Sequence, residues 1–285
     1  MIKPCGEDAH EQREHEMERV LREGAFEGET HVVTGAGQGI GRCVAEALAV
    51  HGAQVVLVDI DPARLDEARM EIKAAGGPEP VVVAANVAEE DEVRRAVARA
   101  LEVSDCINGV VNVAGITRDA RIAKKDFDEF RAVLAVHLHG TFLFTREVAA
   151  QHWHPLFKAN GNQPLADGVN RFIVNFSSVS ARNGNVGQID YTAAKGAIEA
   201  MTRTTAREFA SYGVRANAIA PGPVDTTMLA KVPDEGRRAM ERATLVGRIA
   251  QPEEIGATIC AIADPKLFGY TTGQVFAANG GMYLD

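Results

Sequence analysis

The sequence has few cysteines, few aromatic residues and no long apolar run. Its four cysteines, among 285 residues, form no Cys-x-x-Cys pair and no His/Cys metal spacing. We therefore expect reduced thiols in a cytoplasmic protein that binds no metal. No run of eighteen apolar residues occurs, so we expect no membrane-spanning helix. The first thirty residues are charged and lack the apolar stretch of a secretion signal.

Positive charge is also scarce. Lys and Arg number 30 against 39 Asp and Glu, which gives a formal net charge of -9. No basic run stands against this balance, so the composition argues against a nucleic-acid partner. Hydrophobic residues make up 46%, which is ordinary for a globular protein, and a chain of this length folds without disulfides. The composition indicates an enzyme or a binding protein with a small-molecule ligand.

The chain divides into a short N-terminal extension and one domain. Residues 1–27 are rich in charge and poor in large apolar side chains, and we interpret them as a solvated or subunit-capping extension. Over 28–285, short β-branched runs alternate with amphipathic stretches. The expected strands are Thr30–Thr34, Gln54–Asp59, Pro80–Asn86, Ile107–Asn112, Arg171–Phe176, Val214–Ala220 and Gln274–Ala277. The expected helices lie near 40–51, 62–75, 89–103, 126–152, 188–212 and 252–263.

Several of these runs, such as Val55–Val58, are apolar on both faces, as a parallel sheet covered by helices requires. The fold class predicted is α/β, a Rossmann-type doubly wound, mostly parallel seven-stranded sheet in a single domain. Trp153–Asn170 has no periodicity, and we expect a loop at the amino-terminal edge of the sheet. Ligands bind at the opposite, carboxyl edge. Residues 225–250 follow a strand's carboxyl end, where they could cover a substrate.

A glycine-rich turn, Thr34–Gly41, follows the first expected strand and opens a helix. Glycines there let backbone N–H groups approach a phosphate at the helix N-terminus. Taken alone, the cluster could be only a tight turn, but Asp59 ends the next strand, twenty residues after Gly39. A carboxylate there accepts hydrogen bonds from ribose hydroxyls and repels a 2′-phosphate. Its alternative role as a helix cap suits Asp61 better, because Pro62 would then open the helix. We therefore predict NAD, with NADP less favoured.

A second group carries the chemistry. Tyr191 and Lys195 lie four apart on a helical pattern, so they share one face. A free tyrosine is only about 0.1% ionised at neutral pH, and a nearby ammonium is expected to lower its pKa. Ser178 follows the strand Phe172–Phe176, so its hydroxyl is expected at a strand's carboxyl end. Each residue alone has an ordinary interpretation, chance spacing or a plain loop, but together with the glycine turn they favour a catalytic site.

These motifs, in this order, resemble those of the short-chain dehydrogenase/reductase superfamily over 28–285. The matching segments are TGAGQGIG at 34–41, NVAG at 112–115, Ser178, YTAAK at 191–195 and PGPVDT at 221–226. Among the members, the chain is most similar to bacterial 3-oxoacyl-[acyl-carrier-protein] reductases. That similarity is carried by SARNGNVGQIDYTAAKGAI at 180–198, VRANAIAPG at 214–222 and GRIAQPEEIG at 247–256.

The resemblance implies roles for the residues. Tyr191 would be the acid/base, Ser178 would orient the carbonyl, and Lys195 would hold the nicotinamide ribose and tune the pKa of the tyrosine. It also implies cofactor contacts around the glycine turn and the strand ends: Gly35, Gln38, Gly39, Ile40, Gly41, Asp59, Asn86, Val87, Asn112, Ala114, Gly115, Tyr191, Lys195, Pro221, Gly222, Val224 and Thr226. A homotetramer is the common assembly of this family.

The activity implied is an NAD(P)-dependent oxidoreductase that interconverts a secondary alcohol and a ketone, with a 3-hydroxyacyl/3-oxoacyl thioester as substrate. A hydroxysteroid or polyol dehydrogenase is an alternative with the same chemistry. A dinucleotide-sensing protein without turnover is an alternative of another class. The intact serine, tyrosine and lysine weigh against it.

Three positions depart from the family pattern, and the first is Val113, where the family's NNAG motif has a second Asn. His137 stands where the family carries a catalytic Asn, so it is either a structural substitute or a member of a proton relay. Tyr212 stands where acyl-carrier-protein reductases carry Arg, and Asp59 argues against the NADP that they prefer. These differences leave open whether acyl carrier protein or coenzyme A carries the substrate.

Overall fold

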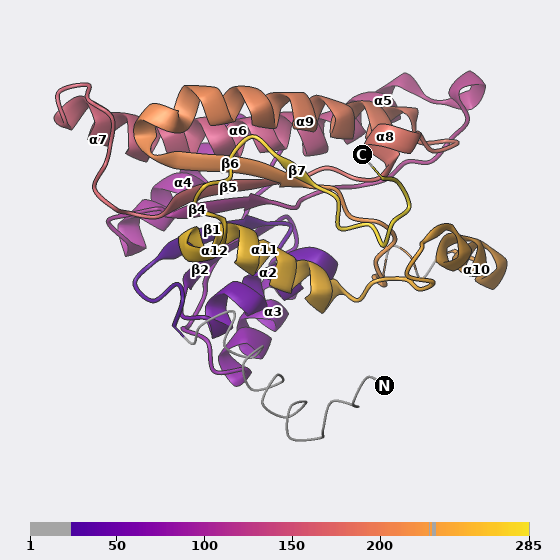
Figure 1. The fold of residues 1–285 in the computed structure, drawn as a ribbon, viewed down its shortest axis with the longest axis horizontal. Helices are drawn as coiled ribbons and strands as arrows, with labels where there is room; N and C mark the ends of the chain where they lie inside the picture. Colours follow the sequence, from indigo (N-terminus) through magenta and orange to yellow (C-terminus); the bar gives the residue numbers. More distant parts are fainter. Residues whose placement is uncertain (1–23, 228, 230–231, 285) are drawn as a thin grey trace, which may run out of the picture.

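A seven-stranded sheet forms the centre of the molecule (Figure 1). The computed structural model describes residues 24–227, 229 and 232–284. The strand order is β3-β2-β1-β4-β5-β6-β7, and every neighbouring pair is parallel. The predicted fold class is confirmed, and the sheet is parallel throughout. The strands are β1 (Thr30–Thr34), β2 (Gln54–Asp59), β3 (Val81–Ala84), β4 (Gly109–Asn112), β5 (Arg171–Phe176), β6 (Val214–Ile219) and β7 (Val275–Phe276).

Helices cover both faces of this sheet (Figure 1). One core contains Val33 and Leu57 and packs against α2 (Gly39–Val50), α3 (Pro62–Ala74) and α11 (Pro252–Ala263). The other core contains Val32 and Val56 and packs against α4 (Glu90–Val103), α6 (Gly140–Val148) and α9 (Ile189–Glu208). Successive strand residues thus point into opposite cores, which explains the runs that are apolar on both faces.

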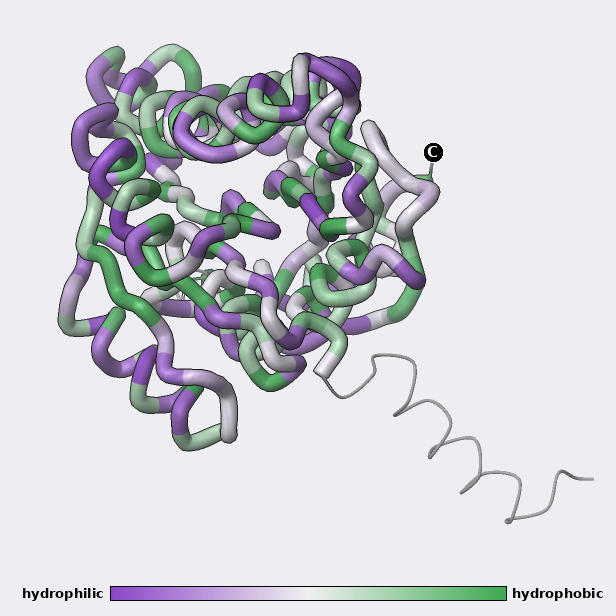
Figure 2. The backbone as a smooth tube through the Cα atoms, turned by 90° about the vertical axis from the view of Figure 1, so that its left-hand side faces the viewer, coloured by the Kyte–Doolittle hydropathy of each residue, from purple (hydrophilic) through white to green (hydrophobic). Residues whose placement is uncertain are grey.

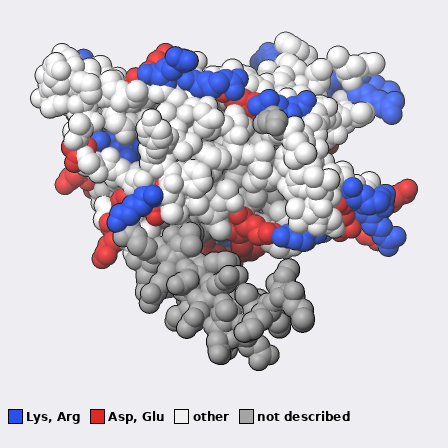
Figure 3. All heavy atoms as spheres, in the orientation of Figure 1, with Lys and Arg blue, Asp and Glu red and all other residues white. Residues whose placement is uncertain are grey.

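The outer surface is polar and mixed in charge. Hydrophilic and hydrophobic residues alternate along the helices (Figure 2), as expected for helices that bury one side. On the face shown in Figure 3, acidic and basic side chains are interspersed around the periphery, and no continuous basic surface forms there. None of the described helices combines the length and the apolar character needed to cross a bilayer.

The helix predicted over 126–152 is longer and less regular than expected. It consists of α5 (Phe127–Leu134), a π-helical turn (Ala135–His139), α6, a second π-helical turn (Ala149–Trp153) and α7 (His154–Ala159). The prediction of a loop from Trp153 onward is therefore wrong over 153–159. Trp153 is fully buried and its Nε1 donates to the carbonyl of Ile107 over 3.0 Å. Pro155 follows the second π-helical turn within this continuous run, and it donates no backbone N–H.

Residues 160–170 do form an irregular connection at the amino-terminal edge of the sheet. Leu165 donates its backbone N–H to Ser211, just before β6, and Asp167 pairs with Arg171 at the start of β5 over 2.7 Å. This position is the predicted one. It keeps the segment away from the carboxyl ends of the strands.

The packed domain begins slightly before residue 28. Phe26 is fully buried in the core against α2, and its backbone N–H donates to His51 over 2.9 Å. The predicted extension is thus too long at its end, and its residues 1–23 lie outside the described residues.

The described residues form three further α-helices, besides the 3-10 helices η1 (Ile122–Lys124) and η4 (Phe209–Tyr212). They are α8 (Ser180–Asn183), α10 (Asp234–Ala243) and α12 (Pro265–Phe268). Helix α10 lies within the 225–250 segment and projects from the body of the molecule (Figure 1). That this segment covers a substrate stays a prediction.

Candidate active site

The glycine-rich turn between β1 and α2 packs tightly on the end of β4. Gly35 has a φ of +66°, and a Cβ atom on it would lie 2.8 Å from the Cα of Ala114. The hydroxyl of Thr34 accepts hydrogen bonds from the backbone of Val113 and Ala114 at 3.1 and 3.2 Å. Only glycine fits this close approach, which leaves the backbone of the turn facing the carboxyl edge of the sheet.

Asp59 lies beside the same turn at the end of β2. Its carboxylate accepts from the backbone N–H groups of Gly37 at 3.0 Å and Asp61 at 3.1 Å. A Cβ on Gly37 would lie 3.0 Å from this carboxylate. Gly37 is therefore needed for the close approach of the turn to Asp59, although it was not among the predicted residues. Asp61 caps α3, accepting from Ala63 at 3.0 Å, which agrees with the division of roles expected from the sequence.

The loops after β1 and β6 face each other across this edge. Gly39 has a φ of +54°, and a Cβ on it would lie 3.6 Å from the methyl group of Thr226. Val224 pairs with Ala250 as an isolated bridge, and the carbonyl of Pro221 accepts from Val179 at 3.1 Å. The predicted nicotinamide loop thus lies between the glycine turn and the segment that follows Ser178. The arrangement fits a dinucleotide stretched along the strand ends.

Two predicted cofactor contacts have structural partners of their own. Asn86 accepts at Oδ1 from the backbone of Ala88 over 3.0 Å, so its side chain closes a turn before α4. Asn112 donates to Asn175 over 2.9 Å, and its own Oδ1 is buried without a partner. A buried acceptor without a donor costs free energy, so this side chain is satisfied only through its amide N–H.

Ser178, Tyr191 and Lys195 come together as predicted. Lys195 is buried on α9 and its Nζ donates to the carbonyl of Phe176, at the end of β5, over 2.6 Å. The same Nζ lies 5.5 Å from the centroid of the Tyr191 ring. Ser178 is buried just after β5 and hydrogen-bonds to the Tyr191 side chain. The end of β5 and the first turns of α9 therefore build one cluster of titratable and hydroxyl groups.

The pKa shifts in this cluster differ from the expected direction. Burial raises the pKa of Tyr191, the hydrogen bond from Ser178 opposes this rise, and the charge of Asp119 adds to it. Burial also lowers the pKa of Lys195 to about 7. Burial disfavours both the phenolate and the ammonium, which opposes the lowering of the tyrosine pKa that was expected from the lysine. Tyr191 therefore holds its proton at neutral pH.

His137 lies against Tyr191 in the π-helical turn. The two rings make a T-shaped contact with centroids 5.1 Å apart. The His137 Nε2 is 2.8 Å from the carbonyl oxygen and 3.0 Å from the amide nitrogen of Ile116, and the tautomer decides which bond forms. Burial lowers the pKa of His137 to about 3, with a further contribution from the charge of Lys195. The ring is neutral at physiological pH.

Gly115 explains how an imidazole fits at this place. A Cβ on Gly115 would lie 2.2 Å from the Cε1 of His137, so only glycine leaves room for the ring. The backbone carbonyl of His137 accepts from the hydroxyl of Thr141 over 2.7 Å. Gly115 is thus at least partly a packing residue, a role that its motif alone does not reveal.

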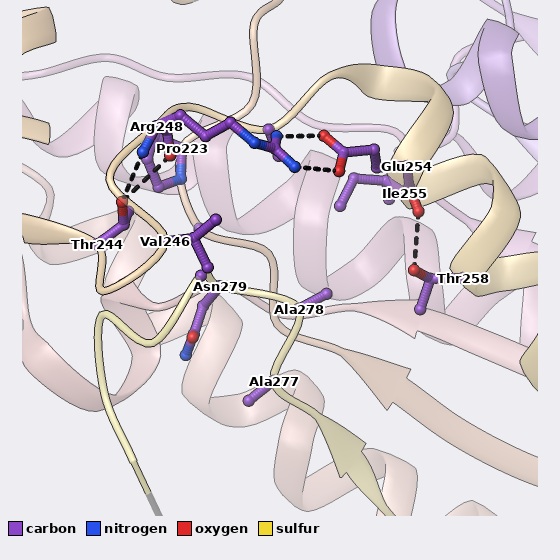
Figure 4. A pocket seen from close by; sticks show the side chains of 13 residues that line it. Pro223, Thr244, Val246, Arg248, Glu254, Ile255, Thr258, Ala277, Ala278 and Asn279 are labelled. Carbon is purple, nitrogen blue, oxygen red and sulfur yellow. Dashed lines mark hydrogen bonds and ion pairs between the residues drawn. The ribbon is translucent and has the colours of Figure 1, made fainter. Parts of the chain in front are cut away.

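A separate cavity of about 260 Å³ lies beyond the nicotinamide loop (Figure 4). It is lined from three segments: Gly222–Pro223, the stretch from Thr244 to Thr258, and Ala277–Gly280. Arg248 and Glu254 form a bidentate ion pair on its wall at 2.6 and 2.7 Å, so the arginine is neutralised. The cavity contains none of the three catalytic candidates, and we assign no ligand to it.

Comparisons with known proteins agree with this geometry. A family model described as enoyl-(acyl carrier protein) reductase matches residues 35–283. The 3-oxoacyl-[acyl-carrier-protein] reductase FabG of Thermotoga maritima is 34% identical over 260 residues, covering 91% of this chain and 99% of that protein. The human (3R)-3-hydroxyacyl-CoA dehydrogenase is also 34% identical over 260 residues, covering 89% and 95%.

A solved structure supports the same assignment. A candidate gluconate dehydrogenase from Agrobacterium tumefaciens superposes with a TM-score of 0.81 at 29% identity, covering 91% of this chain and 98% of that one. The 35–283 range of the family model includes residues 35–41 of the glycine turn and all of α9. The chain therefore belongs to the short-chain dehydrogenase/reductase family, enzymes that act on CH–OH groups with a nicotinamide dinucleotide.

Proposed function

We propose that the protein is an NAD-dependent oxidoreductase that interconverts a 3-hydroxyacyl and a 3-oxoacyl thioester. The observation that carries this proposal is the cluster of Ser178, Tyr191 and Lys195 at the carboxyl edge of the sheet, beside the glycine turn. A binding protein without turnover would have no need to bury an acid/base group next to an ammonium donor. Buried titratable groups of this kind are common at catalytic sites.

The chain's own residues account for the proton chemistry. In reduction, Tyr191 donates its proton to the substrate oxygen while Ser178 donates a hydrogen bond to the same oxygen; in oxidation, the proton returns to the tyrosine. A bound nicotinamide supplies or accepts the hydride at the substrate carbon. Lys195 would hold the ribose of that nucleotide. Burial raises the pKa of Tyr191, so the residue is protonated at neutral pH and can act as the acid in reduction.

We propose NAD(H) rather than NADP(H) as the cofactor. Asp59 supports this, because its carboxylate lies 3.0 Å from the backbone N of Gly37 in the glycine-rich turn. A carboxylate at this place would repel a 2′-phosphate. The test compares kcat/KM with both cofactors. A preference for NADP above tenfold would overturn the assignment.

The named relatives act on 3-oxoacyl or 3-hydroxyacyl thioesters, which supports the same substrate class here. Tyr212 supports coenzyme A as the carrier to test first. In place of a surface cation, its ring contacts Phe157 edge-on and Phe209 at a tilt, and its hydroxyl lies 3.0 Å from Nδ1 of His154. The experiment is a panel of acyl-CoA, acyl-carrier-protein thioesters, steroids and sugar alcohols followed by NADH absorbance. Tight NADH binding without turnover of any of them would favour a dinucleotide-sensing protein.

A further inference from the structure

A buried ion pair lies next to the catalytic tyrosine and has no part in the chemistry described above. The Nζ of Lys125 is 2.8 Å from Oδ2 of Asp190, and the two side chains are only 5% and 1% exposed. The same Nζ donates to the backbone carbonyl of Arg118. Lys125 lies in the loop that follows β4, and Asp190 lies in the first turn of α9.

Asp190 joins this loop to the backbone of Tyr191. Its Oδ1 accepts from the Tyr191 N–H over 2.9 Å, while its Oδ2 binds the lysine. A carboxylate is favoured in the first turn of a helix, because the free N–H groups there carry partial positive charge. The carboxylate of Asp190 thus connects the ammonium of Lys125 to the backbone of Tyr191.

Two more contacts attach the loop to the same short stretch. The backbone N–H of Ala120 donates to Gly187 over 2.9 Å. Gln188 donates from Nε2 to Asp119, with both carboxylate oxygens at 3.2 Å. The 119–125 loop is therefore held at three positions along 187–190, immediately before Tyr191.

We propose that these three contacts form a loop clamp that positions Tyr191 relative to the 119–125 loop. The loop clamp is defined as the pairs Lys125–Asp190, Ala120–Gly187 and Asp119–Gln188, and within it Lys125 and Asp190 are positioning residues. A buried ion pair gains its attraction only in a narrow geometry, because both charges have lost water. Such a pair specifies one relative placement of loop and helix. The inference rests on the proposed role of Tyr191 as the acid/base.

Lys125→Met and Asp190→Asn test the clamp. The first keeps the side-chain length without the charge, and the second keeps an oxygen for the Tyr191 N–H. Lys124→Met is the matched control, since Lys124 is the exposed neighbour of Lys125. We expect both clamp variants to lose at least tenfold in kcat with the Kd for NADH within threefold of wild type. The double variant should lose about as much as either single one, because both act through one contact. The control should match wild type.

Hydrogen exchange separates positioning from general stability. We expect faster amide exchange in 116–125 and 187–192 of both clamp variants, with the rest of the chain unchanged. A kcat within twofold of wild type, or faster exchange across the whole domain, would overturn the proposal. If Lys125→Met does not fold, Gln188→Ala should produce the same local exchange to a smaller degree. If the wild-type protein shows no turnover, the proposed function is rejected instead. Amide exchange in 116–125 and 187–192 would then still show whether the loop clamp exists.

Discussion

At Tyr191, burial and two neighbouring side chains shift the pKa of one hydroxyl in different directions. Burial and the Asp119 charge raise its pKa, and the Ser178 hydrogen bond lowers it. We predict that Tyr191→Phe abolishes turnover and retains NADH binding. The variant keeps the aromatic ring and loses only the hydroxyl that transfers the proton. General acid–base catalysis contributes roughly 10²–10⁴-fold, and kcat measured beside NADH titration checks the loss. Tyr212→Phe is the control, because it removes a tyrosine hydroxyl outside the cluster of Ser178, Tyr191 and Lys195. A Tyr191→Phe variant with more than a tenth of wild-type kcat would exclude the acid/base role.

The influence of Asp119 on Tyr191 predicts a pH shift. Oxidation of an alcohol needs the phenolate, so its rate should rise with pH through the pKa of Tyr191. Asp119→Asn removes a charge that disfavours the phenolate. The midpoint of the pH–rate profile for oxidation should therefore move to lower pH. A midpoint that stays in place, or moves upward, would contradict this coupling.

His137 gives a prediction for stability at low pH. Its pKa is about 3 in the folded protein and about 6.5 when unfolded. The unfolded chain binds the extra proton between these values, so stability falls as pH drops below about 6.5. At pH 5 this amounts to about 2 kcal/mol. His137→Asn should lack this loss, and denaturant midpoints of both proteins at pH 7.5 and pH 5 measure it.

The same variant tests whether His137 carries protons. We propose a structural role, since a ring that is held by Ile116 and is neutral near pH 7 does not change its protonation state there. His137→Asn should then keep kcat within a few-fold. A hundredfold fall in kcat with an unchanged melting temperature, together with loss of a transition near pH 6–7, would make it a relay residue.

At the scale of elements, two carboxylates near the start of α3 are expected to have different roles: Asp61 caps the helix, and Asp59 contacts the cofactor. Asp61 accepts from the first-turn backbone of α3, so Asp61→Ala should cost about 1 kcal/mol of stability. The KM for NAD should stay unchanged. Asp59→Asn should instead weaken the discrimination between NAD and NADP and leave the helix intact. Urea melts and cofactor kinetics on both variants test the division; a raised KM for NAD in Asp61→Ala would reverse it.

The elements themselves were largely predictable. Each strand and the helices α2, α3, α4, α9 and α11 lie close to their predicted ranges, because hydrophobic periodicity is local. The run from α5 to α7 was harder, since Trp153 continues it by burying its ring against distant residues. Phe26 was assigned to the extension for a similar reason. A single apolar residue in a charged stretch shows no periodicity.

At the scale of the whole molecule, we predict a homotetramer. The family resemblance motivates this assembly. Light scattering at micromolar concentration should give about four times the mass of one chain, which is 30.5 kDa. A particle of one chain's mass would contradict the prediction.

The sequence alone was enough to predict the parallel sheet, the glycine turn beside Asp59, and the shared face of Tyr191 and Lys195. These features depend on residues a few positions apart, or on the rule that parallel strands end at one edge. Tertiary structure decided what surrounds them. Lys125 and Asp190 are separated by 65 positions, and His137 meets Ile116 across 21. Such contacts depend on the path of each loop over the sheet, and the direction of the Tyr191 pKa shift depends on burial. Neither is encoded in local spacing.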